Sequence, residues 1–132
     1  MGARHKSRKR AVDVLFEADQ RQSSVVEVLE ERSAQAQHPA NPYTVQLVQG
    51  FVEHADEIDD LIETNAVGWT LDRMPAVDRA VLRLATLELR WPPDDVSPAV
   101  VIDEAVELVK ELSTDESPAF VNGVLGRIAG PV

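Results

Sequence analysis

The chain has 132 residues, of which 44% are hydrophobic, and this is enough to build one globular domain with a substantial core. It has no cysteine, which excludes disulfide frameworks, thiol nucleophiles and cysteine-ligated zinc sites. No apolar run reaches the roughly 18–20 residues of a membrane span, and acidic residues from Asp13 onward interrupt any signal-peptide core. The sequence therefore predicts a cytoplasmic protein.

The net charge of −10 is distributed very unevenly along the chain. Residues 1–10 carry +5 with no acidic residue, so the rest of the chain carries −15. The basic residues of this arm are Arg4, Lys6, Arg8, Lys9 and Arg10. Cations near a helix N-terminus oppose the helix dipole at about 0.3–1 kcal/mol each, so helix stability does not explain them. A basic arm on an acidic body indicates a polyanionic partner. A solvated, disordered basic tail stays open as the alternative.

Apolar residues recur with the helical period in the first half of the chain, and no segment alternates as a strand does. The pattern predicts a helix from about Arg8 to Arg21, a short helix around Val25–Leu29 and a loop over residues 35–40. Asn41-Pro42 predicts the cap and first turn of one long helix that ends near Gly68.

The second half predicts three further helices. The first follows Pro75, stops at Pro92-Pro93 and is apolar almost all round, which places it at the centre of the molecule. Ser97-Pro98 and Ser117-Pro118 predict the caps of the last two helices. The expected architecture is all-α, a compact bundle of about six to seven helices.

The spacing of the basic residues predicts how the arm is oriented. At about 100° per residue, Arg4 and Arg8 share the line that continues through Leu15, so they face inward at the rim of the core. Lys6 and Arg10 point the other way. A cluster that wraps a helix end in this manner can bind several phosphates.

The helix after Pro75 has a single polar stripe, formed by Arg79, Arg83, Thr86 and Arg90. This stripe is a candidate surface for a phosphate backbone or a partner protein. Salt bridges to acidic neighbours are the alternative interpretation, because the chain has 23 acidic residues.

Asn122-Gly123 lies inside the final helix, where glycine costs up to about 1 kcal/mol against alanine. Tight helix packing or the close approach of a ligand would explain this glycine. Asn122 can read the edge of a base and Phe120 can stack on one, although Phe120 also fits a packing role in the core.

The sequence lacks the residues for catalysis. The three histidines, His5, His38 and His54, are not at metal-ligand spacing, and there is no phosphate-binding loop or nucleophile elbow. Acidic residues 56–63 lack the order of a calcium loop and are interpreted as a solvated helix face. No enzyme activity, metal or cofactor is predicted.

Three segments resemble segments of the NusB family, and they follow one another in the same order and at the same spacing as in that family. They read RHKSRKRAVDVLFE at 4–17, WTLDRMPAVDRAVLRLA at 69–85 and VVIDEAVELVKELSTDESPAFVNGVLG at 100–126. The first and third are similar to the actinobacterial branch. The resemblance implies one all-helical RNA-binding domain with subdomains of roughly 1–68 and 69–132. It also implies binding of boxA RNA in ribosomal RNA transcripts, a heterodimer with the ribosomal protein NusE, and entry into an RNA polymerase antitermination complex.

The resemblance also assigns roles by position. The residues that match its RNA-binding motifs, together with their basic neighbours, are Arg4, His5, Lys6, Arg8, Lys9, Arg10, Phe120 and Asn122. The residues that match a region involved in complex formation, toward RNA or NusE, are Asp78, Arg79 and Arg83. The departures are Ser7 for a usual alanine, His5 for a common arginine and Gly126 for a common acidic residue.

Three alternatives stay open at this point. Some family members form homodimers that mask the arginine helix, and the sequence does not decide whether this chain does. The second alternative is that the chain is a pure protein-interaction scaffold, in which the basic arm has no role in binding RNA. A similar helical domain also precedes the catalytic domain of ribosomal RNA cytosine methyltransferases, but this chain lacks the cysteine nucleophile.

Overall fold

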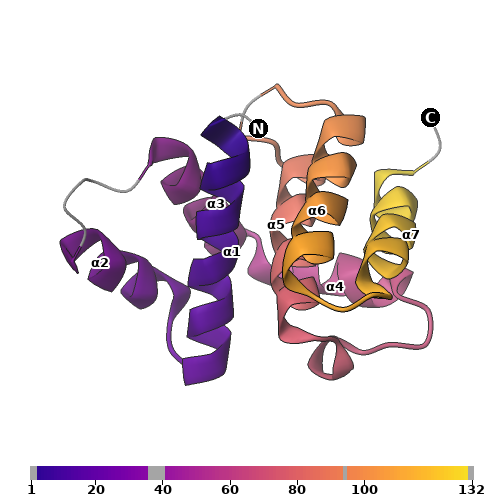
Figure 1. The fold of residues 1–132 in the computed structure, drawn as a ribbon, viewed down its shortest axis with the longest axis horizontal. Coiled ribbons are helices and arrows are strands. Elements are labelled where there is room, and N and C mark those ends of the chain that lie inside the picture. Colours follow the sequence, from indigo (N-terminus) through magenta and orange to yellow (C-terminus); the bar gives the residue numbers. More distant parts are fainter. Residues whose placement is uncertain (1–2, 36–40, 94, 131–132) are drawn as a thin grey trace.

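The computed structural model describes residues 3–35, 41–93 and 95–130. These ranges form seven α-helices and one 3-10 helix, with no strand among them (Figure 1). The α-helices are α1 (Ala3–Arg21), α2 (Val25–Gln35), α3 (Pro42–Glu53), α4 (Ala55–Asn65), α5 (Ala76–Arg90), α6 (Pro98–Leu112) and α7 (Ser117–Ala129), and η1 (Leu71–Arg73) precedes α5. The predicted all-α bundle is confirmed.

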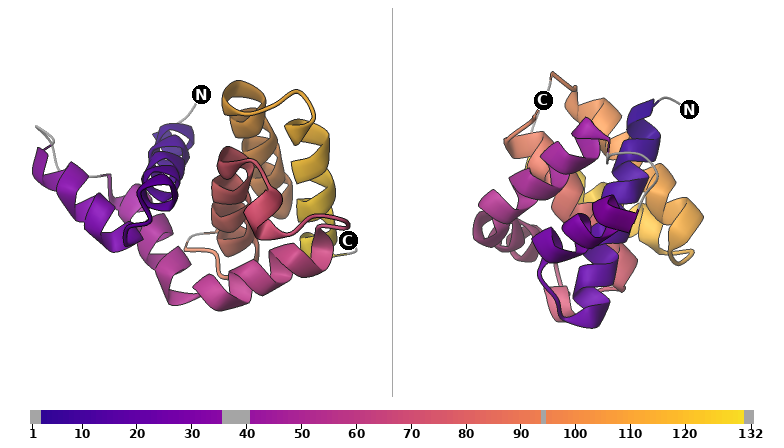
Figure 2. Two further views of the ribbon diagram at one scale, coloured as in Figure 1. Left: turned by 90° about the horizontal axis from the view of Figure 1, so that it is seen from below. Right: turned by 90° about the vertical axis from the view of Figure 1, so that its left-hand side faces the viewer.

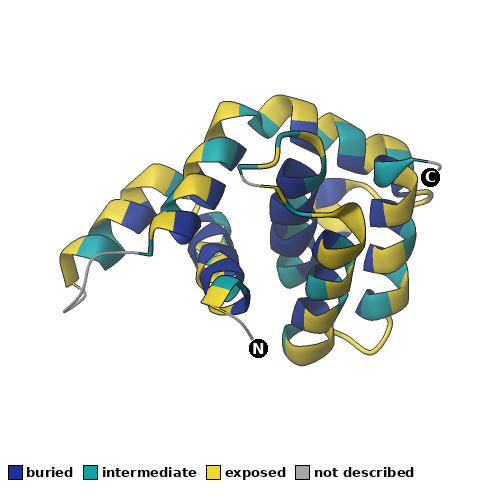
Figure 3. Ribbon diagram, turned by 90° about the horizontal axis from the view of Figure 1, so that it is seen from above, coloured by how far each residue is buried: buried dark blue, intermediate teal, exposed yellow. Residues whose placement is uncertain are grey.

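Helix α5 is the central element, as its apolar pattern predicts. It packs against α1, α3, α4, α6 and α7. Nine of its 15 residues are buried, whereas the outer helices bury mainly the sides that face it (Figure 3). Helices α1, α2 and α3 lie on one side of α5, and α6 and α7 lie on the other (Figures 1 and 2). The division into subdomains at 68/69 stays a prediction.

The single long helix predicted after Asn41 is wrong, because the chain breaks at His54. The backbone N–H of His54 ends α3 by donating to the carbonyls of Gly50 and Phe51, both at 3.2 Å. The His54 ring stacks on Trp91 with centroids 4.3 Å apart. After the break, α4 packs against α5 and α7. A Cβ on Gly50 would lie 2.9 Å from Leu87 Cδ2, so glycine permits the close packing of α3 on α5 just before the break.

Two of the three predicted caps are confirmed. Asn41 accepts the backbone N–H of Tyr43, and Ser97 accepts that of Val100. Ser117 is instead the first residue of α7, and its hydroxyl donates to buried Asp78 and accepts the N–H of Thr114. Most of the predicted loop, at residues 36–40, lies outside the described residues.

Candidate nucleic-acid interface

The basic residues at positions 3–10 belong to α1, which begins five residues earlier than the predicted start at Arg8. The first turns of α1 are fixed to the beginning of α3 by hydrogen bonds. The hydroxyl of Ser7 lies 2.9 Å from Oδ1 of Asn41, and the hydroxyl of Thr44 donates to the carbonyl of Ser7 at 3.0 Å. The departure from alanine at Ser7 therefore ties the arm to the cap of α3. The arm is an ordered helix end rather than a disordered tail.

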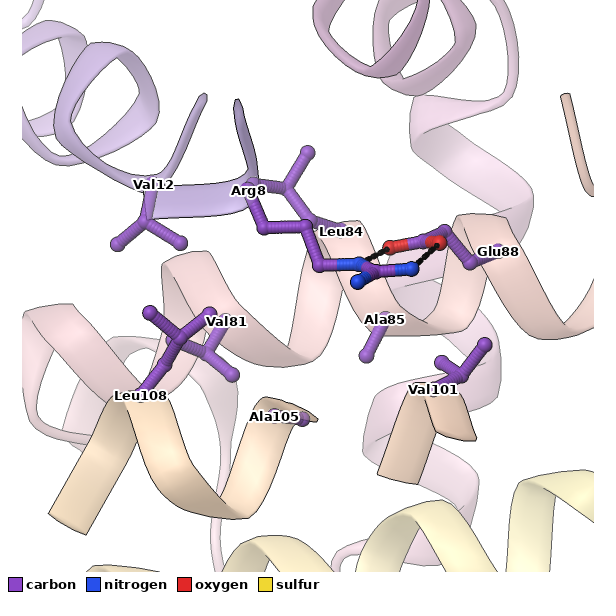
Figure 4. Close-up of a pocket in the computed structure, with 9 residues that line it drawn as sticks. All are labelled: Arg8, Val12, Val81, Leu84, Ala85, Glu88, Val101, Ala105 and Leu108. Carbon is purple, nitrogen blue, oxygen red and sulfur yellow. Dashed lines mark hydrogen bonds and ion pairs between the residues drawn. The ribbon is translucent and has the colours of Figure 1, made fainter. Parts of the chain in front are cut away.

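Arg8 lies inside the molecule, as its helical position predicts. Its side chain forms two hydrogen bonds to the Glu88 carboxylate, Nε to Oε1 at 2.8 Å and Nη2 to Oε2 at 2.9 Å (Figure 4). Arg8 is 5% exposed and Glu88 3%. The Tyr43 hydroxyl donates to the same carboxylate at 2.7 Å. Burial lowers the pKa of Arg8, but the hydrogen bond and charge of Glu88 outweigh it and raise that pKa above its usual value. This network joins α1, α3 and α5.

Alkaline titration of Tyr43 reports on this network directly, since Tyr43 is the only tyrosine in the chain. Burial, followed by the hydrogen bond to Glu88, raises the pKa of Tyr43 to about 12. The absorbance of tyrosinate should therefore appear near pH 12 in the folded protein and near about pH 10 after unfolding in urea. Since the folded pKa is raised, the stability contributed by Tyr43 is complete below about pH 10 and is lost as the pH rises toward 12. A folded-state midpoint near 10 would contradict the buried Tyr43–Glu88 contact.

His5 and Lys9 face acidic residues on α6. Nδ1 of buried His5 lies 2.6 Å from Glu104 Oε2, and Lys9 Nζ lies 2.5 Å from Glu111 Oε1. The hydrogen bond from Lys9, followed by its charge, lowers the pKa of Glu111. One side of the arm is therefore paired with the protein's own carboxylates.

The opposite side of the arm is open to solvent. Lys6 and Arg10 are exposed, and neither forms an ion pair within the described part of the chain. Arg4 does not belong to this side: it is half-buried on the line that it shares with Arg8, with its guanidinium carbon 4.8 Å from the centre of the Tyr43 ring. The orientation predicted for Lys6 and Arg10, away from the core, is confirmed. The arm thus has a paired inner side and a charged outer side.

The arginines of the α5 stripe form the salt bridges that the sequence allowed as the alternative. Nε of Arg79 donates to Asp19 at 2.9 Å, and its Nη1 donates to the carbonyl of Leu71 at 2.6 Å. Arg83 binds both carboxylate oxygens of Asp59, at 2.9 and 3.1 Å. These contacts hold α5 to α1, η1 and α4. A partner-binding role for Arg79 and Arg83 stays a prediction.

The remaining residues of the stripe differ in exposure. Thr86 is fully buried and Arg90 is exposed, so the predicted polar stripe is not one continuous surface. Asp78, assigned to the same region by resemblance, is 2% exposed and accepts hydrogen bonds from Ser113 at 2.6 Å and Ser117 at 2.9 Å. Its carboxylate joins α5 to the turn between α6 and α7. The predicted role of Asp78 at a partner surface is untested by these contacts.

Phe120 lies beside an aromatic residue that the sequence reasoning missed. The ring of Trp69 is 49% exposed and meets Phe120 edge-on, with centroids 6.2 Å apart. Both rings line an open cavity of about 300 Å³. In the sequence, Trp69 is a large aromatic residue directly after Gly68, and it begins the second segment that resembles the NusB family. This cavity combines an apolar wall with the polar turn that follows α6.

Asn122 and Gly123 lie on a more open part of α7. Asn122 is exposed. A Cβ on Gly123 would meet only the guanidinium of Arg127, at 3.5 Å, which is ordinary contact. Tight packing of helices therefore does not account for Gly123 within the described residues.

The described ranges contain neither a metal site nor a membrane-spanning helix. No group of three or more His, Asp or Glu side chains there is suited to hold a metal ion. No helix in the same ranges is long and apolar enough to cross a membrane.

Comparison with known proteins identifies the family. A family model described as the NusB family matches residues 5–130. The transcription antitermination protein NusB of Saccharopolyspora erythraea is 63% identical over 131 residues, covering 98% of this chain and 88% of that protein. The structure of T. maritima NusB matches with a TM-score of 0.83 and 36% identity, covering 97% of this chain and 91% of that one. A structure of antitermination factors NusB and NusE in complex with dsRNA matches with a TM-score of 0.77 and 33% identity, over 97% and 98% of the two chains. The chain therefore belongs to the NusB family, as its sequence motifs predict.

Proposed function

We propose that this chain is a transcription antitermination factor that binds boxA RNA together with NusE. The observation that carries the proposal is the pair of exposed cations, Lys6 and Arg10, on the ordered first turns of α1, with half-buried Arg4 beside Tyr43 at the rim. Cationic side chains on a fixed helix end suit the phosphates of a single strand. The relatives named as antitermination proteins, and the related NusB and NusE structure that contains RNA, support the same reading.

Within this function the two sides of the arm have different roles. The outer residues Lys6 and Arg10 contact phosphates, and Arg4 contributes from the rim beside Tyr43. Lys9 contributes only partly because Glu111 holds it. Arg8 and His5, predicted to bind RNA, instead position the arm, since both are at most 8% exposed and bonded to Glu88 and Glu104. Phosphate contacts of this kind fix the position of the RNA and carry no information about its sequence.

The aromatic cavity is the proposed second contact with RNA. A base stacks on Trp69 or Phe120, and a stacked base typically contributes about 1–3 kcal/mol. Asn122 is exposed on the same helix as Phe120, where its amide is free to pair with the edge of a base. The preference for a particular RNA sequence then arises at the aromatic cavity and Asn122, whereas the basic arm provides most of the affinity.

The remaining roles follow from the same proposal. Asp78, Arg79 and Arg83 shape the surface offered to NusE through their internal bonds, and the complex acts on RNA polymerase in the cytoplasm, where transcripts are made. The chain has no catalytic role. The subdomain boundary near 68/69 separates the side that carries the arm from the side that carries the aromatic cavity.

Titration of labelled boxA RNA into the chain, with and without equimolar NusE, tests the function. We expect RNA binding that NusE strengthens. A chain that binds NusE but leaves RNA binding unchanged is a protein-interaction scaffold, and methyl transfer by the isolated chain would point to an enzyme. A scrambled RNA of the same length and composition is the control for sequence preference.

A further inference from the structure

Basic side chains of α1 face acidic side chains of α6. His5 and Lys9 are one helical turn apart on α1, and they meet Glu104 and Glu111, which are two turns apart on α6. Glu104 also lies 4.0 Å from Arg8 Nη1, and Glu111 lies 4.0 Å from His5 Nε2. The three basic side chains His5, Arg8 and Lys9 therefore each lie within 2.8 Å of a carboxylate oxygen.

The two ends of this contact between α1 and α6 differ in exposure. The His5 side chain is 9% exposed and its Glu104 partner 24%, so this end is fixed inside the molecule. At the other end, Lys9 and Glu111 are 41% and 46% exposed. Exposed pairs of this kind contribute little to stability and exchange readily with solvent or another anion. Hydrogen bonding raises the pKa of Lys9 and lowers that of Glu111, so both stay charged at neutral pH.

The position of Glu111 is the second observation. It lies on the last turn of α6, directly before the turn that contributes Thr114 and Glu116 to the wall of the aromatic cavity. An RNA strand that contacted both the basic arm and the aromatic pair would pass this end of α6, because the turn after α6 lines the same cavity as the two rings. Glu111 is thus a half-exposed acid that already pairs with the arm at this end of α6.

We propose that Glu111 limits the affinity for RNA by competing with an RNA phosphate for Lys9. The proposal rests on the proposed function, because it concerns the same interface. A phosphate that approaches Lys9 must displace the Glu111 carboxylate and is also repelled by it. Loss of this carboxylate frees Lys9 for one more phosphate contact. The Glu111 carboxylate thereby competes with RNA for Lys9, so the affinity for RNA is lower than it would be if Lys9 were unpaired.

The test is Glu111→Gln, which keeps the shape and removes the charge. We expect RNA to bind about 5-fold more tightly, equally for boxA and scrambled RNA, since phosphate contacts are independent of sequence. The log–log salt slope should become steeper by about 0.7, the value for one more phosphate on a single strand. Glu53→Gln, an exposed acid at the far end of α3 with the same charge change, should alter affinity less than about 2-fold.

A double-mutant cycle separates competition for Lys9 from a general electrostatic effect. In a Lys9→Gln background, Glu111→Gln should change RNA affinity by less than about 2-fold. An equal gain with and without Lys9, a similar gain from Glu53→Gln, or no gain from Glu111→Gln would overturn the proposal. If the wild type binds RNA but Glu111→Gln has no effect, only this inference fails. If the wild type does not bind RNA, with or without NusE, the proposed function fails as well.

Discussion

Replacement of Arg8 by alanine should destabilise the fold by about 3–5 kcal/mol, the largest effect expected of any single substitution in the arm. The change leaves the Glu88 carboxylate, 3% exposed, without its cation, and the Tyr43 hydroxyl remains as its side-chain donor among the described residues. An uncompensated buried charge costs far more than the loss of contact area alone. Urea denaturation followed by circular dichroism measures the loss.

Two controls make this result specific to the buried pair. Arg10→Ala removes the same kind of side chain from an exposed position on the same helix, and should change stability by no more than about 0.5 kcal/mol. The double change Arg8→Met with Glu88→Leu replaces both charges by apolar groups and should recover most of the loss. If Arg8→Ala costs no more than Arg10→Ala, the buried pair does not exist as described.

The double change Lys6→Gln with Arg10→Gln should weaken RNA binding by about 30-fold, at about 1 kcal/mol for each phosphate contact. Both side chains are exposed near the N-terminus of α1, so their removal also relieves unfavourable charge at the helix dipole. The variant should therefore be as stable as the wild type or slightly more stable. Fluorescence anisotropy with labelled boxA RNA in the presence of NusE measures the affinity.

The matched control is Arg21→Gln with Lys110→Gln. It makes the same change in net charge but places it at the other end of α1 and on α6, away from Lys6 and Arg10. Its effect on RNA affinity should stay below about 3-fold, through long-range charge alone. Equal losses in the two double variants would mean that RNA responds to net charge and not to the arm.

Local sequence signals predict where a helix begins when a single capping residue determines its start. Asn41 and Ser97 cap α3 and α6 because their side chains need only a backbone N–H two or three residues away. Ser117 was misassigned because its hydroxyl bonds to Asp78, 39 residues earlier in the chain. The break at His54 was missed because the apolar stripe continues in register through it, and the stacking partner Trp91 is far away in sequence.

The same distinction applies to the site. The helical period was enough to predict that Arg8 faces inward and that Lys6 faces solvent. It could not predict that Glu88 is the partner of Arg8, because the chain has 23 acidic residues and the choice among them depends on how α1 docks on α5. Trp69 was missed for a related reason, since only the folded chain brings it to Phe120.

The dependence of RNA affinity on salt is the most direct test of the claim that the outer cations of α1 hold RNA phosphates. Two contacts from the outer residues Lys6 and Arg10, with a third from Arg4 at the rim, predict a log–log slope of about −2 for a short single-stranded boxA RNA. In the Lys6→Gln and Arg10→Gln variant the slope should become shallower by about 1.4, the value of two lost contacts. A wild-type slope near zero, or the same slope in both proteins, would contradict the account.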